Sequence, residues 1–171
     1  MRQVILFIAT SLDGYIARTD GSIDWLFTDQ DYGYTAFSAG VDTIIMGRKT
    51  YEQVLTFGEF PYAGKECFVF SRNPARGSDD RVVFLDDDPS DLLGRLRSRT
   101  GKNIWLVGGS ELIHEFVLQD LIDTCVISIH PVILGSGIPL FRAPLPQQSL
   151  VLRDTTTFNT GLVQLTYTRK R

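Results

Sequence analysis

The sequence predicts an α/β fold of three layers, in which a mostly parallel central sheet is covered by helices and ends in an antiparallel hairpin. Three observations indicate this architecture. Strand-like apolar runs alternate with helix signals through most of the chain. The central runs are almost continuously apolar, which is typical of strands buried on both faces of a parallel sheet. The last two runs alternate more and are joined by Asn159-Thr160-Gly161, which predicts a hairpin at the sheet edge.

The expected strands are runs rich in β-branched and aromatic residues. They lie near Val4–Ala9, Thr43–Met46, Glu66–Phe70, Val82–Leu85, Ile104–Val107, Thr124–His130, Leu150–Phe158 and Leu162–Thr168. The first run follows Met1-Arg2-Gln3 and resembles a weak signal peptide. It is short, however, and it leads into the turn signal Asp13-Gly14 without a small-residue cleavage pattern. We therefore interpret it as a buried first strand.

Helix signals separate the earlier strands. One helix begins at Asp88-Pro89, a capping residue followed by a proline at the first helical position, and Gly101 fits its C-terminal stop. Another helix is expected through Tyr34-Thr35-Ala36-Phe37, before Gly40. Apolar residues at helical spacing mark the core-facing sides of the remaining helices. These residues are Tyr51, Val54 and Leu55, then Leu92 and Leu96, then Leu112, Ile113, Phe116 and Val117.

Length and composition indicate one domain over residues 1–171 with the balance of a soluble globular protein, at 43% hydrophobic and 22% charged residues. The formal net charge is −3, and no basic block stands out beyond Arg169-Lys170-Arg171, which argues against a nucleic-acid partner. No apolar stretch approaches the ~20 residues that cross a bilayer. Cys67 and Cys125 lie in apolar runs without the spacing of a zinc site, so we expect free buried thiols, no metal and a cytoplasmic location.

Two glycine turns each close an apolar strand and open a helix, at Gly47 and at Gly108-Gly109. Such a turn leaves backbone N–H groups without partners at the positive end of the helix dipole, where they attract phosphate. Two such turns in one small domain could hold both ends of a dinucleotide. Other common glycine-rich motifs do not match this sequence. The chain has no G-x-G-x-x-G, it lacks the Gly-Lys-Ser/Thr that a P-loop requires, and it has no nucleophile elbow.

Five segments carry a family resemblance. They are Ala9 to Ala17, Met46 to Glu52, Phe70-Ser71-Arg72 followed by Asp79-Asp80-Arg81-Val82, Val107-Gly108-Gly109, and Pro131 to Phe141. In this order and spacing the chain resembles the dihydrofolate reductase superfamily. It resembles especially the branch formed by the C-terminal reductase domain of the bifunctional riboflavin-biosynthesis deaminase/reductase. No zinc-ligand pattern of the kind expected for the deaminase half is found in this sequence.

The resemblance implies an NADPH site. The turn of Gly108 and Gly109 would approach the cofactor pyrophosphate, since a Cβ there would block close contact. Arg48 would bind the 2′-phosphate with its two-pronged guanidinium, and the strand end at Ser71 and Arg72 would contribute to the same subsite. Ala9, a small residue, and Ile16, a branched one, would line the nicotinamide ring. The full set implied is Ala9, Ile16, Gly47, Arg48, Lys49, Thr50, Ser71, Arg72, Val107, Gly108, Gly109, Ser110 and Glu111.

The catalytic acid is less well defined by the sequence. Folate reductases carry a carboxylate before the first glycine turn, and the ungapped match is Asp31. A small gap would move the assignment to Asp24 or Asp29, and all three could also be solvated loop carboxylates. Ser128 matches a hydroxyl residue that supports the acid in the folate enzymes, or it is an ordinary strand hydroxyl.

Three further residues are candidates for substrate contact. Asp13 could cap its turn or touch substrate, and Trp25 could stack on a ligand or anchor the core. Lys65 stands where the folate enzymes place an arginine after Pro-x-x-Gly, here Pro61-Tyr62-Ala63-Gly64, and lysine cannot grip a carboxylate with two parallel bonds. His130, before Pro131, is interpreted as structural or cleft-lining.

The resemblance therefore implies an NADPH-dependent oxidoreductase similar to 5-amino-6-(5-phosphoribosylamino)uracil reductase of riboflavin biosynthesis and to dihydrofolate reductase. It would transfer a hydride to a small heterocyclic substrate of the pyrimidine or pterin type. The alternative is a non-catalytic NADPH-binding module that has lost its acid. A homodimer is a further expectation, because the family often pairs.

Overall fold

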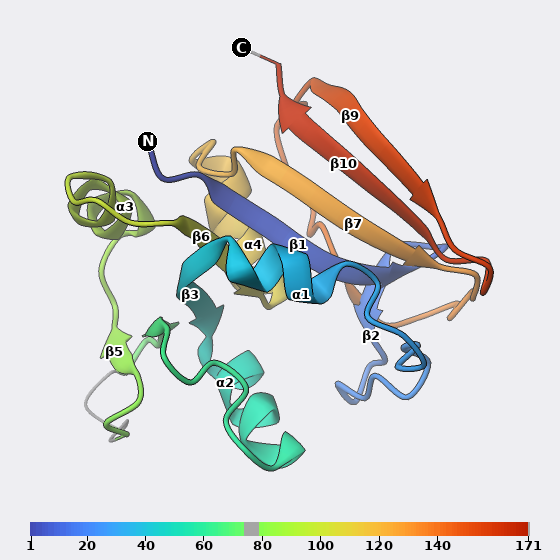
Figure 1. Ribbon diagram of the computed structural model, residues 1–171, viewed down its shortest axis with the longest axis horizontal. Coiled ribbons are helices and arrows are strands. Elements are labelled where there is room, and N and C mark those ends of the chain that lie inside the picture. Colours follow the sequence, from blue (N-terminus) through green and yellow to red (C-terminus); the bar gives the residue numbers. More distant parts are fainter. Residues whose placement is uncertain (74–78, 171) are drawn as a thin grey trace.

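The computed structural model describes residues 1–73 and 79–170 and is built around one eight-stranded sheet (Figure 1). The strand order is β5-β4-β3-β6-β1-β7-β10-β9. The strands are β1 (Val4–Ser11), β3 (Val41–Gly47), β4 (Glu66–Phe70), β5 (Val83–Leu85), β6 (Asn103–Gly108), β7 (Thr124–His130), β9 (Leu150–Thr157) and β10 (Val163–Arg169). All pairings are parallel except those of β10, which runs antiparallel to both β7 and β9. The predicted fold class, with a C-terminal hairpin at the sheet edge, is confirmed.

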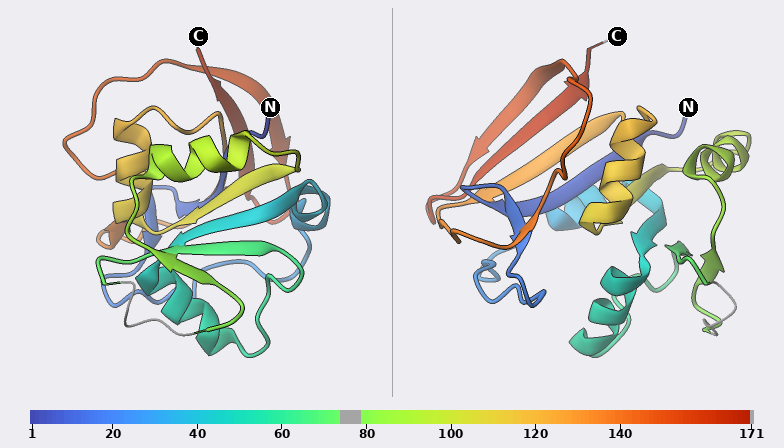
Figure 2. Two further views of the ribbon diagram at one scale, coloured as in Figure 1. Left: turned by 90° about the vertical axis from the view of Figure 1, so that its left-hand side faces the viewer. Right: turned by 180° about the vertical axis from the view of Figure 1, so that it is seen from behind.

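Helices cover both faces of the sheet (Figure 2). They are α1 (Tyr34–Ala39), α2 (Arg48–Val54), which continues into the short 3₁₀ helix η1 (Leu55–Phe57), α3 (Pro89–Arg97) and α4 (Ser110–Leu118). Successive residues of one strand enter opposite cores because side chains alternate along a strand. Ile45 packs in the core beneath α3 and α4, whereas Ile44 and Met46 pack in the core beneath α2. This alternation explains why the central runs are apolar at nearly every position.

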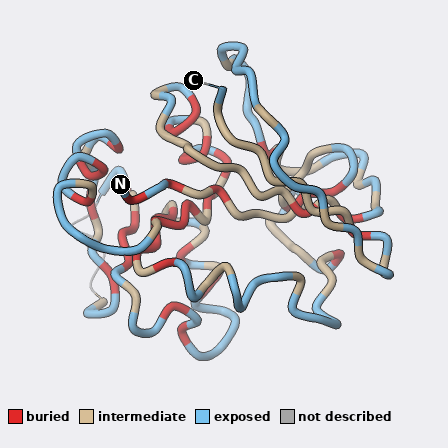
Figure 3. The backbone as a smooth tube through the Cα atoms, turned by 45° about the horizontal axis from the view of Figure 1, so that its top comes forward, coloured by how far each residue is buried: buried red, intermediate tan, exposed pale blue. Residues whose placement is uncertain are grey.

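Burial is greatest in the central strands and falls toward the hairpin (Figure 3). Leu6, Ile45 and Leu106 of three adjacent strands have no exposed surface. Burying each of these side chains contributes about 1.5–3 kcal/mol. The edge strand β9 is largely exposed, with Leu152 at 50% of its full accessibility. The stable core therefore lies under the strands whose ends carry the glycine turns.

The start of α3 is formed as the sequence predicts, but its end is not. The Asp88 carboxylate accepts a hydrogen bond from the Ser90 N–H at 2.8 Å, with Pro89 at the first helical position. The helix ends at Arg97, so the prediction of Gly101 as its stop is wrong. Gly101 instead lies against the buried Arg2, where a Cβ would be 2.7 Å from the guanidinium carbon.

The prediction that Leu55 shares the buried face of Tyr51 and Val54 is also wrong. Leu55 is 39% exposed, because the α-helix ends at Val54 and the chain tightens into η1. The change of helical pitch rotates Leu55 away from the core.

A second, two-stranded sheet pairs β2 (Tyr15–Ala17) with β8 (Ile138–Pro139) and was not predicted. Strands this short carry no readable alternation. The pairing is close, since a Cβ on Gly137 would lie 2.3 Å from the Ala17 carbonyl oxygen. It fixes the segment after β1 against the segment after β7.

The described part of the chain contains no helix with the length and apolar character that a membrane span requires.

Two glycine-to-alanine substitutions should change stability in opposite directions. A Cβ on Gly94, within α3, meets nothing within 4 Å, so Gly94→Ala should raise the free energy of unfolding by about 0.5–1 kcal/mol. A Cβ on Gly101 would lie 2.9 Å from Asp42 Oδ2 as well as against Arg2, so Gly101→Ala should lower it by about 1–3 kcal/mol. Urea unfolding of both variants measures these changes. If Gly101→Ala left the free energy of unfolding unchanged, this would contradict the close contact of Gly101 with Arg2 and Asp42.

Candidate functional site

A cleft of about 1720 Å³ opens at the carboxyl ends of the parallel strands. Ligands of open α/β sheets bind at this edge of the sheet. Most residues predicted to bind the cofactor line this cleft. They are Ala9, Ile16, Gly47, Arg48, Lys49, Thr50, Ser71, Arg72, Val107, Gly109, Ser110 and Glu111. The structure thus brings the predicted set together, although their role in binding stays a prediction.

The two glycine turns meet because β3 and β6 are neighbours in the sheet. Met46 pairs with Gly108 in the register of these strands. A Cβ on Gly47 would lie 3.7 Å from the Gly109 nitrogen, and a Cβ on Gly109 would lie 3.2 Å from Thr50 Oγ1. Gly108 has a φ of +120°, which side chains rarely adopt, and the Gly108–Gly109 peptide is cis. Because Gly47 and Gly109 have no side chains, the backbone stays open to the cleft at the starts of α2 and α4.

Neither helix start at this junction has a side-chain cap among the described residues. Gly47 precedes α2 and Gly109 precedes α4, and no side chain bonds the free N–H groups of either first turn. Ser110, the first residue of α4, is 5% exposed, and its hydroxyl donates to the Pro139 carbonyl at 2.5 Å. The first turn of α4 therefore keeps N–H groups for an anion.

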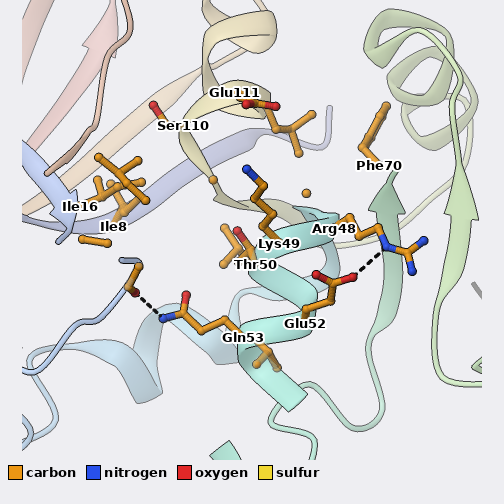
Figure 4. A pocket seen from close by; sticks show the side chains of 18 of the residues that line it. Ile8, Ile16, Arg48, Lys49, Thr50, Glu52, Gln53, Phe70, Ser110 and Glu111 are labelled. Atoms are coloured by element: carbon orange, nitrogen blue, oxygen red, sulfur yellow. Dashed lines mark hydrogen bonds and ion pairs between the residues drawn. The ribbon is translucent and has the colours of Figure 1, made fainter. Parts of the chain in front are cut away.

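Among the described residues, four cations line the cleft together with six carboxylates, and these cations are Arg48, Lys49, Arg72 and Arg142. Figure 4 shows Lys49 pointing from α2 toward Ser110 and Glu111, while Arg48 leaves α2 on the side of Phe70. The Arg48 Nε donates to Glu52 Oε1 at 2.9 Å. The three arginines are held only by partly exposed ion pairs, which contribute little to stability.

Glu111 lies between two of these arginines in the first turn of α4. Its carboxylate is 3.1 Å from Arg142 and 3.5 Å from Arg72, and the Arg72 side chain is 95% exposed. Ser71, at the end of β4, is buried, and its N–H donates to the Leu85 carbonyl at 2.9 Å. The phosphate subsite predicted at Ser71 and Arg72 therefore has one fixed residue and one mobile cation.

A second pocket of about 440 Å³ adjoins the cleft. Phe7, Ala9 and Leu26 line both cavities and form their junction. The two residues predicted for catalysis, Asp31 and Ser128, line the second pocket. Ala9 and Ser128 are paired in the register of β1 and β7, so they share one face of the sheet. The predicted nicotinamide position and the predicted acid are thus placed on either side of one junction.

Of the three carboxylates considered for the acid, only Asp31 lines either pocket. Its carboxylate accepts hydrogen bonds from the Thr35 hydroxyl at 2.5 Å and the Thr35 N–H at 3.0 Å. These bonds lower the pKa of Asp31 below its usual value. Asp31 is therefore an ionised acceptor at neutral pH, not a stored proton.

The other two carboxylates are held in the loop before α1. Asp24 accepts two bonds from Arg18, at 2.6 and 3.0 Å, and Asp29 accepts one from the Tyr32 hydroxyl at 2.7 Å. These donors lower the pKa of each carboxyl.

Ser128 is 6% exposed, and its hydroxyl is oriented by Gln164 of β10. Its Oγ accepts from Gln164 Nε2 at 2.9 Å, and the same amide donates to the Tyr32 carbonyl at 3.3 Å. The Ser128 hydroxyl proton then remains for a group in the pocket. Gln164 was not predicted, since only the register of β10 against β7 places it beside Ser128.

The three residues predicted for substrate contact lie outside the lining of both pockets. Asp13 accepts from the Ser11 hydroxyl and from the N–H groups of Leu134 and Gly135, so it joins two loops. Trp25 is 9% exposed, packs edge-on against His130, and its Nε1 has no partner in the part of the chain described. Lys65 donates to the Ser38 and Val41 carbonyls, each at 2.7 Å.

His130 holds the wall of the second pocket. Its Nε2 accepts from the Phe27 N–H at 3.2 Å, and its Nδ1 lies 3.4 Å from the Ser128 carbonyl. The ring must be neutral with its proton on Nδ1, because Nε2 is an acceptor. Burial lowers the pKa of His130 and favours this form.

The cysteines are free, and Cys67 is buried while Cys125 is half-buried. Burial raises the pKa of each thiol to about 11. Within residues 1–73 and 79–170 no group of three or more histidine, cysteine or acidic side chains gathers as a metal site would require.

Comparison with known proteins agrees with this geometry. Residues 2–164 match the family model of the RibD C-terminal domain. The uncharacterized protein YwjB of Bacillus subtilis (strain 168) is 44% identical over 98% of each chain. A provisionally assigned riboflavin biosynthesis protein of Shewanella sp. PV-4 has a crystal structure with a TM-score of 0.87, at 36% identity over 99% of each chain.

A more distant structure shares the fold alone. It is the diaminohydroxyphosphoribosylaminopyrimidine deaminase/5-amino-6-(5-phosphoribosylamino)uracil reductase of Thermotoga maritima, at a TM-score of 0.77 and 17% identity. The match covers 99% of the present chain and 57% of that protein.

His130→Gln should remove a pH-dependent part of the stability. The folded state keeps His130 neutral and the unfolded state protonates it near pH 6.5, so the wild type loses stability as pH falls below about 6.5. A glutamine can still accept from the Phe27 N–H and does not titrate. Urea unfolding between pH 5 and 8 should give the variant a shallower slope, by at most about 1.4 kcal/mol per pH unit. Parallel slopes would show that His130 does not titrate in this way.

Proposed function

This chain belongs to the RibD C-terminal domain family, and we propose that it is an NADPH-dependent reductase of a small heterocyclic compound. The observation that carries the proposal is the junction of two glycine turns in one cleft. Gly47 and Gly109 lie side by side at the starts of α2 and α4, with cations around them. Side chains are missing at the positions where a Cβ would narrow the approach to the backbone.

The residues of the cleft fit a dinucleotide with an extra phosphate. The uncapped first turn of α4, at Gly109 and Ser110, would bind the pyrophosphate. Arg48 and Arg72 would bind the 2′-phosphate, since a guanidinium can donate to two phosphate oxygens. A ligand there would replace the Glu52 and Glu111 carboxylates as the partner of these arginines. The volume is ample, because clefts for such ligands range from about 300 to 1,000 Å³.

The acceptor would occupy the second pocket, across the junction from the cleft. NADPH supplies a hydride from its nicotinamide ring when bound. Ala9 is small enough to leave the junction open, and Ile16 borders the cleft beside it. Ser128 would donate its hydroxyl proton in a hydrogen bond to an acceptor atom of the substrate. Asp31, as an acceptor, would hold a ring N–H, and the proton needed after hydride transfer would come from solvent.

The hydrogen bonds of Asp31 also favour a second candidate function. A carboxylate whose pKa is lowered is a poor proton donor at neutral pH. The chain could therefore be a binding module that keeps the cleft without turning over an acceptor.

Two further expectations belong to the proposal. The reduced state of Cys67 and Cys125 suits a cytoplasmic protein. A homodimer is proposed from the resemblance alone.

Binding and oxidation of NADPH separate the two candidates. Both predict saturable binding, seen as a rise in melting temperature with NADPH concentration. The reductase predicts, in addition, loss of absorbance at 340 nm only when an aminopyrimidine or dihydropterin is added. Binding without oxidation across such a panel would favour the module. A melting temperature that NADPH leaves unchanged would contradict both.

Arg48→Ala should separate NADPH from NADH. Removing the guanidinium should raise the Kd for NADPH about tenfold or more and that for NADH less than about twofold, since NADH has no 2′-phosphate. Isothermal titration calorimetry measures both constants. Arg99→Ala is the control, because Arg99 pairs with Glu66 and is outside the cleft lining. Equal weakening of the two cofactors by Arg48→Ala would argue against a 2′-phosphate role.

A further inference from the structure

We propose that the second pocket binds an uncharged planar ring compound and discriminates against a phosphorylated one. The inference rests on the proposed function, because it treats this pocket as the place of the hydride acceptor. It is carried by the charge of the described lining of this pocket, which has a carboxylate and no cation.

Cations are absent from the described lining of the second pocket, whereas four line the cleft beside it. Among the described residues that line this pocket, the one charged side chain is the carboxylate of Asp31. Hydrogen bonds from Thr35 keep that carboxylate ionised. An incoming phosphate would meet a like charge and no partner, and charged groups without partners are costly to desolvate.

Two cations outside both linings, Arg18 and Lys65, are already engaged. Arg18 makes a two-point contact with Asp24, at 2.6 and 3.0 Å. The ammonium of Lys65 donates to two backbone carbonyls, each at 2.7 Å, and Lys65 lies outside both linings. Releasing Lys65 would leave the carbonyls of Ser38 and Val41 without that donor. Lys65, a candidate for substrate contact by sequence position, therefore makes a structural contact instead.

The walls of the pocket suit a flat ring. Four aromatic side chains of the described residues line it, Phe7 from β1 and Phe27, Tyr32 and Tyr34 from the segment 26–34. Phe27 packs against the ring of His130 at 4.9 Å between centroids, which fixes its position. Aromatic side chains bind a ring through its faces and edges. The volume of about 440 Å³ is in the range of small-molecule pockets.

The polar groups of the pocket match a neutral ring with both donors and acceptors. Ser128 offers a hydroxyl proton, because Gln164 already occupies its oxygen at 2.9 Å. Asp31 offers carboxylate oxygens for a ring N–H. A carbonyl and an N–H of an uncharged heterocycle would satisfy both, whereas a phosphate offers mainly acceptors.

A matched pair of compounds tests the proposal. The probes are 5-amino-6-(ribosylamino)uracil and its 5′-phosphate, each titrated by calorimetry into the whole protein saturated with NADP⁺. The unphosphorylated compound should bind at least about tenfold more tightly. Equal affinity, or tighter binding of the phosphate, would overturn the proposal. Binding of neither compound would also overturn it, because the pocket would then not take a ring of this class.

Thr28→Lys adds a cation to the pocket lining, and Thr28→Gln is a control of similar length without charge. Thr28 is exposed, so both variants should fold. Thr28→Lys should raise the affinity for the phosphate, relative to that for the unphosphorylated compound, about fivefold or more, with the gain lost at high salt. A similar gain in Thr28→Gln, or none in either, would contradict exclusion by charge.

Saturation with NADP⁺ is measured first and keeps this test distinct from that of the proposed function. If the protein did not bind NADP⁺, this result would contradict the proposed function. Normal cofactor binding with the wrong preference between the two probes would remove only the inference about the acceptor.

Discussion

The candidate site depends on the pairing of β3 with β6 in parallel. Parallel strands end at the same edge of a sheet, so the glycine turns that follow them are brought into contact although about sixty residues separate them. Each strand is buried on both faces, which holds the turns in place from below. Neither turn alone would distinguish a ligand site from an ordinary helix start. Their contact, with the Cβ position of Gly109 against Thr50, is what makes one continuous cleft.

The two cavities are chemically different although they share three residues. The described lining of the cleft combines four cations with six carboxylates, and two helices begin there without a side-chain cap. The second pocket is aromatic, with one carboxylate and one oriented hydroxyl. Its shape depends on contacts from three directions: His130 on β7, Gln164 on β10 and the hydroxyl of Tyr32 to Thr160 in the hairpin turn. The hairpin thus contributes to the site as well as to the edge of the sheet.

The sequence was sufficient for the strands, the hairpin and the helix beginning at Pro89, because these follow from periodicity, turn signals and capping. The residues of the cleft were named from the family resemblance, and the glycine turns alone gave only the place of a phosphate site. The sequence was insufficient where a role depends on contacts made across the fold. Lys65 has the position of a substrate ligand by sequence order, but the carbonyls of Ser38 and Val41 take its ammonium. Gln164 and His130 could not be assigned because strand register, not local pattern, places them beside Ser128 and Phe27.

The small sheet of β2 and β8 has a consequence for how the protein folds. Together with the bonds from Leu134 and Gly135 to Asp13, it links the beginning of the chain to a segment more than a hundred residues later. Contacts of such long sequence separation form slowly, because a large loop must close before they are made. During synthesis the wall of the cleft that carries Ile16 cannot settle until the segment around Gly135 has left the ribosome.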